Sequence, residues 1–194
     1  LTVAAAAAFA FGAPAAHAQK IGLAMAQLDT FLTTLKDGTL DAAKKAGATV
    51  QVEDAQNDVG KQLSQIQNFI AQKVDAIIVN PVDTDATPKI TKLAADAKIP
   101  LVYVNRKPVD FEKLGAGVAF VASDERVSGT LQTQHICKLR KGKGDVLVLM
   151  GELSNEAART RTKDIEEVVA TPDCKGMKIV DKREGKWSRT NAQD

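Results

Sequence analysis

The sequence predicts an α/β fold made of two Rossmann-like lobes, each a parallel sheet flanked by helices, with the second lobe incomplete. Short apolar runs of strand length alternate with longer segments whose apolar residues recur at helical spacing. An aperiodic segment at 107–117, which holds Pro108 and two glycines, interrupts this alternation once. Because strict alternation favours a parallel sheet with helices on both faces, the interruption separates two such units.

The first lobe is expected at residues 19–122. Its strand-length runs are either continuously apolar or alternate between apolar and polar residues, as strands of a buried sheet do. The expected strands are 21–26, 49–53, 74–79, 99–104 and, after the rhythm restarts at Gly117, 118–122. The segments between the first four carry apolar residues at helical spacing, and the expected helices are 31–46, 59–73 and 85–97.

The second lobe is expected at residues 123–194 and repeats the same pattern. Its expected helices are 124–140 and 157–170, and its expected strands are 145–150 and 177–181. In sheets of this kind, ligands bind beyond the carboxyl ends of the strands. A site between the two lobes is therefore expected at the strand ends.

Residues 1–18 have the composition of a secretory signal peptide. They are almost all apolar or small, contain no charged residue, and end in Ala16-His17-Ala18. We expect cleavage after Ala18 and a periplasmic location for the remainder. Because no Met or basic segment precedes Leu1, and 190–194 resembles the start of another helix, we expect the chain to be truncated at both ends.

The charges are balanced along the chain, with 26 Lys and Arg against 24 Asp and Glu. The short basic run 138–143 is typical of the last turn of a helix, so no nucleic-acid partner is expected. The sequence has no nucleophile spaced with a base and no metal-binding cluster. The glycines at 115–117 precede a strand, whereas a dinucleotide fingerprint joins a strand to a helix. The sequence therefore predicts neither an enzyme nor a bound cofactor.

Cys137 and Cys174 have two interpretations. In an exported protein they can form a disulfide, because the compartment is oxidising. They can equally be two buried apolar thiols. A zinc site is not expected, since two cysteines and the distant His135 lack the spacing of tetrahedral ligands.

Four motifs occur in order at strand ends and helix starts: Asn80-Pro-Val-Asp-Thr-Asp-Ala86, Ile99-Pro-Leu-Val-Tyr-Val-Asn-Arg106, Val121-Ala-Ser-Asp124 and Ala157-Ala-Arg-Thr-Arg161. Together they resemble the ribose-type sugar-binding proteins of bacterial ABC transporters, which are type I periplasmic binding proteins. Asn105 and the segment Trp187-Ser-Arg189 favour the branch similar to inositol and rhizopine binders. The resemblance implies a monomeric clamp that holds its ligand between two lobes and delivers it to a membrane permease.

The resemblance and the chemistry of hydroxyl groups together indicate seven ligand-binding candidates. A sugar or cyclitol ring has apolar C–H faces and a belt of hydroxyls, which suits aromatic platforms beside planar polar groups. Phe31 and Trp187 are the expected platforms, and Arg106 and Arg161 offer forks of hydrogen-bond donors. The expected acceptors of hydroxyl protons are Asp29, Asn80 and Asn105.

Several of these residues can instead serve the fold alone. Phe31 lies among apolar residues at helical spacing and can pack in the core. Arg106 and Arg161 can form surface ion pairs, and Asn80 can shape the turn before a proline. The stretch around Phe31 departs from the ribose pattern, with one aromatic where two are usual and Asp29 where an Asn is typical. The substrate need not be ribose.

Two other function classes share the expected architecture, so the fold alone does not decide the function. A ligand-sensing ectodomain of a chemoreceptor or sensor kinase would require a transmembrane helix beyond the expected C-terminal truncation. An effector domain of the lactose-repressor type would follow a helix-turn-helix, whereas this chain begins with an expected export signal.

Overall fold

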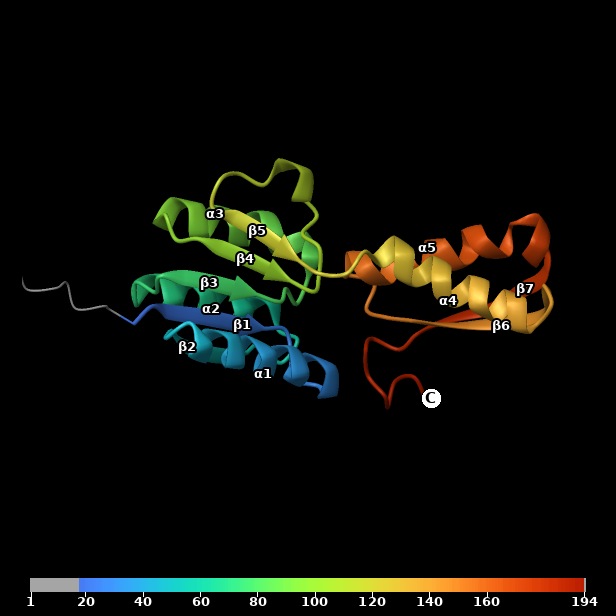
Figure 1. Cartoon of the computed structure of the whole chain (residues 1–194), viewed down its shortest axis with the longest axis horizontal. Helices are drawn as coiled ribbons and strands as arrows, with labels where there is room; N and C mark the ends of the chain where they lie inside the picture. Colours follow the sequence, from blue (N-terminus) through green and yellow to red (C-terminus); the bar gives the residue numbers. More distant parts are fainter. Residues whose placement is uncertain (1–17, 194) are drawn as a thin grey trace, which may run out of the picture.

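The structure, a computed structural model, describes residues 18–193. The expected signal peptide at 1–18 lies outside the described residues, except for Ala18. Within the described part, the fold class is confirmed: parallel sheets are flanked by helices in two units (Figure 1). Among these residues, no helix combines the length and the apolar character needed to cross a bilayer.

The first lobe is built on a five-stranded parallel sheet. Its strand order is β2-β1-β3-β4-β5, and the strands are β1 (Lys20–Met25), β2 (Thr49–Asp54), β3 (Ala76–Val79), β4 (Leu101–Val104) and β5 (Val118–Val121). Figure 1 shows the arrowheads of these strands directed toward the second lobe. Because parallel strands end at one common edge, the side chains just beyond their ends gather at the same place.

Helices cover both faces of this sheet. Successive side chains of a strand point to opposite faces. Leu23 therefore packs with Leu32 of α1 (Thr30–Lys45), while Ala24 packs with Phe69 of α2 (Val59–Ala71). The helix α3 (Thr87–Ala97) adds Ile90 to the α2 side. The resulting core holds the carboxyl edge of the sheet in place.

The second lobe contains two helices against a two-stranded parallel sheet. Its elements are α4 (Glu125–Leu139), β6 (Lys143–Met150), α5 (Glu156–Val169) and β7 (Gly176–Glu184). The two helices lie side by side along the sheet (Figure 1). Residues 122–124 connect β5 to α4. The segment 107–117, which was expected to separate the two units, instead joins β4 to β5 within the first sheet, because β5 pairs in parallel with β4.

A disulfide joins Cys137, near the end of α4, to Cys174, in the short 3-10 helix η3 (Pro172–Cys174) that precedes β7. The two Cα atoms lie 5.7 Å apart, and both residues are buried with Val168 and Met177 in a small apolar cluster. The structure therefore confirms the first interpretation of this cysteine pair, a disulfide. It closes a long segment of the second lobe, whose apolar cluster is small.

The element bounds differ from the expected ones where local chemistry intervenes. The strand expected at 99–104 begins at Leu101, after Pro100, which has no N–H to donate to a neighbouring strand. The helix expected at 85–97 starts as the 3-10 helix η1 (Thr84–Ala86) before α3 begins. Asp83 caps this first turn by accepting a hydrogen bond from the Asp85 N–H at 2.8 Å.

Candidate functional site

A cavity of about 460 Å³ lies between the lobes, at the carboxyl edge of the first sheet. Each lobe provides five of the residues that line it. From the first lobe come Asp29, Phe31, Leu32, Asn105 and Arg106, and from the second come Ser123, Glu125, Ala157, Arg161 and Trp187. Six of the seven expected ligand-binding residues therefore lie at one cavity, although the chain separates them widely.

Asp29 and Phe31 reach the cavity from the start of α1. The Asp29 carboxylate caps this helix, accepting hydrogen bonds from the Leu32 N–H at 2.7 Å and from Gln27 Nε2 at 2.9 Å. Phe31 is 63% exposed and stands at the cavity wall, not in the core. Its ring is therefore available to the apolar face of a ligand.

Asn80 differs from the other candidates, because it is fully buried and does not line the cavity. Its side-chain amide donates to the Val104 carbonyl and to Asn105 Oδ1, both at 3.3 Å. Its own Oδ1 accepts from the Ala26 N–H at 3.4 Å. Asn105 is at the cavity wall in a left-handed conformation, with φ of 65°. Asn80 thus lies behind Asn105 and orients it.

Arg106 is a buried cation at the cavity wall, with 6% of its surface exposed. Nη1 donates to the carbonyls of Pro81, at 2.7 Å, and Val82, at 3.2 Å, which leaves Nε and Nη2 available to the cavity. Within residues 18–193 no carboxylate lies within ion-pairing distance of it. Burial lowers the pKa of Arg106 to about 10, against the opposing effect of Asp29 and Glu152, so the side chain stays charged at neutral pH.

Arg161 forms an ion pair and also lines the cavity. Its Nε donates to a carboxylate oxygen of Glu125, a buried residue at the start of α4. The guanidinium lies 5.9 Å from the centre of the Trp187 ring, within the range of a cation–π contact. The other carboxylate oxygen of Glu125 is buried and has no hydrogen-bond partner among the described residues. It is an unsatisfied acceptor beside the ion pair with Arg161.

The position of Trp187 depends on Gly151, which directly follows β6. A Cβ built on Gly151 would collide with the indole ring, so only glycine leaves room for it. Lys186 and Trp187 both have positive φ, 49° and 57°, which non-glycine residues rarely adopt. Such conformations persist where the surroundings enforce them, often at functional sites.

We expect Gly151→Ala to displace the Trp187 ring and weaken ligand binding about tenfold, because overpacking of this size costs about 1–3 kcal/mol. Trp187 is the only tryptophan, so a red shift of the intrinsic emission reports its displacement. The matched control is Gly38→Ala on α1, where a new Cβ would meet nothing within 4 Å. Unchanged emission and affinity in Gly151→Ala would show that the ring does not depend on this glycine.

Sequence reasoning missed four residues of the cavity: Leu32, Ser123, Glu125 and Ala157. Glu125 is the most consequential of them. A glutamate in the first turn of a helix is expected from the helix dipole alone, so its position carried no separate signal of binding. Its pairing with Arg161 could not be seen, since the two residues are 36 positions apart.

No metal site competes with this cavity in the described part of the chain, where no group of three or more His, Cys, Asp or Glu side chains is placed to hold an ion. The groups that the cavity wall offers are aromatic faces, a buried guanidinium, an ion pair and amide groups. These groups suit a neutral ligand rich in hydroxyls.

Comparison with known proteins agrees with this geometry. A periplasmic binding protein domain matches residues 21–194. The "Putative rhizopine-binding protein" of Rhizobium meliloti is 60% identical over 182 residues, which cover 93% of this chain and 59% of that protein. The ribose import binding protein of Escherichia coli K12 is 31% identical over 140 residues, covering 72% of this chain and 46% of that protein.

Solved structures are similar over most of the chain. An ABC transporter solute-binding protein from Bacillus halodurans, with bound myo-inositol, has a TM-score of 0.80 and 34% identity, covering 89% of this chain and 59% of that one. The arabinose-transporter binding protein of Shewanella sp. ANA-3 has a TM-score of 0.80 and 30% identity, covering 89% and 57%. The chain thus spans about half to six tenths of the length of these relatives. It belongs to the periplasmic binding protein family.

Proposed function

We propose that the protein is the periplasmic substrate-binding component of an ABC transporter and binds a sugar or cyclitol in the cavity between its lobes. The proposal is supported by the cavity volume of about 460 Å³, which lies within the usual range for small-molecule sites. It is also supported by relatives whose names refer to rhizopine, ribose and myo-inositol. The same relatives are named as binding proteins, which supports a role without catalysis.

The observation that carries the proposal is the environment of Arg106. A buried guanidinium without a carboxylate partner is costly unless its remaining donors find acceptors. The hydroxyl oxygens of a polyol can accept from Nε and Nη2 together without bringing a charge of their own. Phe31 and Trp187 then face the apolar sides of the ring. Ligands that lack the hydroxyls would leave the guanidinium unpaired and bind poorly.

The mechanism rests on the division of the site between the lobes. Each lobe alone offers half of the lining, so a ligand makes its full set of contacts only when both are close. Such a ligand shifts the population toward the closed form in proportion to its preference for that form. The closed form is the state that the proposed permease would recognise.

Titration of the complete gene product with myo-inositol, D-ribose, D-galactose and a rhizopine tests the proposal. Binding is followed by calorimetry and by the emission of Trp187, with L-leucine as a control ligand that has no hydroxyl on its side chain. We expect a saturable response to at least one of the four polyols and none to leucine. A flat titration with all four would contradict a sugar or cyclitol site.

We expect Arg161→Ala to weaken binding of the responding polyol at least about tenfold, because it removes a charged donor and leaves Glu125 buried without its cation. Arg183, which pairs with Asp181 on the surface of β7, offers a matched control, and Arg183→Ala should leave the affinity unchanged. Equal affinities of the two variants would remove Arg161 from the site.

A further inference from the structure

The start of α5 is the place where the two lobes make polar contact away from the cavity. The helix begins at Glu156, and its N-cap residue, Asn155, makes no side-chain capping hydrogen bond. The first N–H groups of a helix have no partner inside the helix and need acceptors from elsewhere. Asn155 is almost completely buried, so water has little access here.

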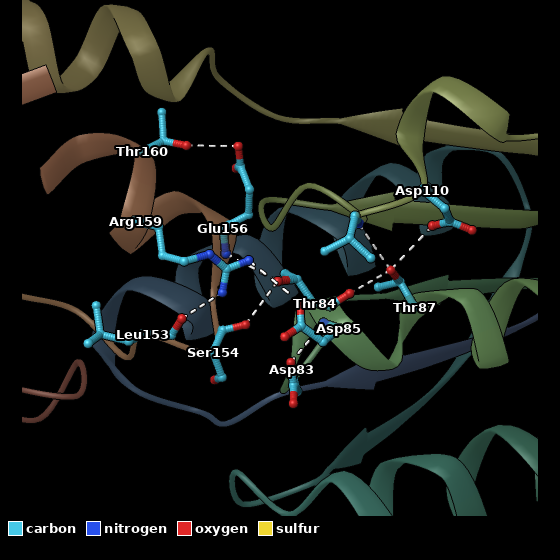
Figure 2. A network of polar contacts seen from close by, with 11 residues as sticks. Asp83, Thr84, Asp85, Thr87, Asp110, Leu153, Ser154, Glu156, Arg159 and Thr160 are labelled. Atoms are coloured by element: carbon cyan, nitrogen blue, oxygen red, sulfur yellow. Dashed lines mark hydrogen bonds and ion pairs between the residues drawn. The ribbon is translucent and has the colours of Figure 1, made fainter. Parts of the chain in front are cut away.

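Thr84 of the first lobe supplies the missing cap. Its hydroxyl oxygen accepts a hydrogen bond from the Glu156 N–H at 3.1 Å. The same hydroxyl donates to the Ser154 carbonyl at 2.9 Å, and the Thr84 N–H points to this carbonyl at 3.3 Å. Figure 2 shows these contacts between η1 and the loop before α5. Thr84 is fully buried, although it is a small polar residue in a turn.

We propose that Thr84 is a positioning residue that locks the closed form by capping α5 from the opposite lobe, and that it thereby sets ligand affinity without touching the ligand. This rests on the proposed binding function. Thr84 does not line the cavity, whereas Ala157 and Arg161 do, and both lie within the first two turns of the helix that it caps. The contacts of Thr84 thus fix the position of this cavity wall, at the start of α5, relative to the first lobe.

Hydrogen bonds within the first lobe fix the position of Thr84. The Thr87 hydroxyl donates to the Thr84 carbonyl at 2.7 Å (Figure 2). It also accepts from the Val109 N–H at 3.2 Å. Within the described residues, the Thr84 hydroxyl itself bonds only to the second lobe. Removing that hydroxyl therefore leaves the first lobe intact, and its cost falls on the closed form, where the Ser154 carbonyl and Glu156 N–H lose their partner.

A second contact between the lobes lies nearby but is exposed. Arg159 Nη2 approaches Asp85 Oδ1 at 3.6 Å, with 41% and 66% of the two side chains exposed. Exposed pairs of this kind contribute little and are screened by salt. Arg159→Gln is therefore a matched control: it removes an exposed contact between the lobes and leaves the buried cap in place.

The test compares Thr84→Val with Thr84→Ser in the complete gene product. We expect Thr84→Val to raise the dissociation rate of the responding polyol about tenfold with little change in the association rate, because the lost contacts form after encounter. Thr84→Ser keeps the hydroxyl and should bind as the wild type does, and Arg159→Gln should change the affinity less than about twofold. Thermal unfolding without ligand should show that all of these variants are folded.

Hydrogen exchange of the Glu156 amide gives a readout that needs no ligand. We expect faster exchange in Thr84→Val than in the wild type and Thr84→Ser, since the cap is lost. Equal exchange in all three proteins would overturn the proposal, whatever the titrations show. A wild type that binds none of the polyols but shows the difference in exchange would contradict the binding function and leave the cap supported.

Discussion

Replacing Arg106 by Gln is expected to weaken binding of the responding polyol about a hundredfold, the largest effect of any single substitution in the cavity. The guanidinium is buried, charged and without a carboxylate partner in the described residues, and two of its nitrogens remain for the cavity. Charge-assisted hydrogen bonds to ligand hydroxyls are the strongest that this cavity can offer. Calorimetric titration of wild type and variant measures the difference directly.

Arg106 also donates to the Pro81 and Val82 carbonyls, so the variant must be shown to fold. Thermal unfolding without ligand provides that check. Arg106→Lys separates charge from geometry, since lysine keeps the cation but loses the planar fork, and it should also bind poorly. Wild-type affinity in a folded Arg106→Gln would refute the central role of this guanidinium.

Removal of the disulfide is expected to lower the free energy of unfolding of the second lobe by about 4 kcal/mol. The bridge spans a sequence separation of 37, and cross-links of this length restrict the unfolded chain by about that amount. The lobe relies on it, because the apolar cluster around Cys137 and Cys174 contains few other residues. Denaturant unfolding of Cys137→Ser/Cys174→Ser measures the loss.

Reduction of the wild type should reproduce the behaviour of the double variant, and reduction of the variant itself should change nothing. The bridge lies at the end of α4 that is remote from the cavity, whereas Glu125 stands at the start of that helix. Ligand affinity measured well below the unfolding midpoint should therefore be retained. Coincident unfolding curves for oxidised wild type and double variant would contradict the stabilising role.

The fold could be predicted closely because its signals are local. Strands such as Thr49–Asp54 and helices such as Val59–Ala71 show their period within a dozen residues. The site candidates at strand ends, such as Arg106, could be predicted because parallel strands bring the residues beyond their ends to one edge. The expected roles of these side chains in binding a ligand stay predictions, which titration of the variants tests.

The features that could not be predicted from the sequence depend on contacts between distant parts of the chain. Nothing near Asn80 indicated that its amide would be occupied by Val104 and Asn105, 24 and 25 residues away. The role of Thr84 depends on a carbonyl 70 residues further along. Phe31 was ambiguous because helical spacing alone does not tell a core position from a place at the helix start beside a cavity.

The cavity residues stand beyond strand ends and at helix starts, and most of them lie outside the apolar clusters that hold the sheets together. Under the proposed function, exchanging one of these residues should alter which molecule is recognised while the apolar clusters stay intact. A few such substitutions would then suffice to change the ligand of a protein with this architecture. Because the residues proposed for recognition lie apart from the sheet cores, ligand preference can change while the fold is kept.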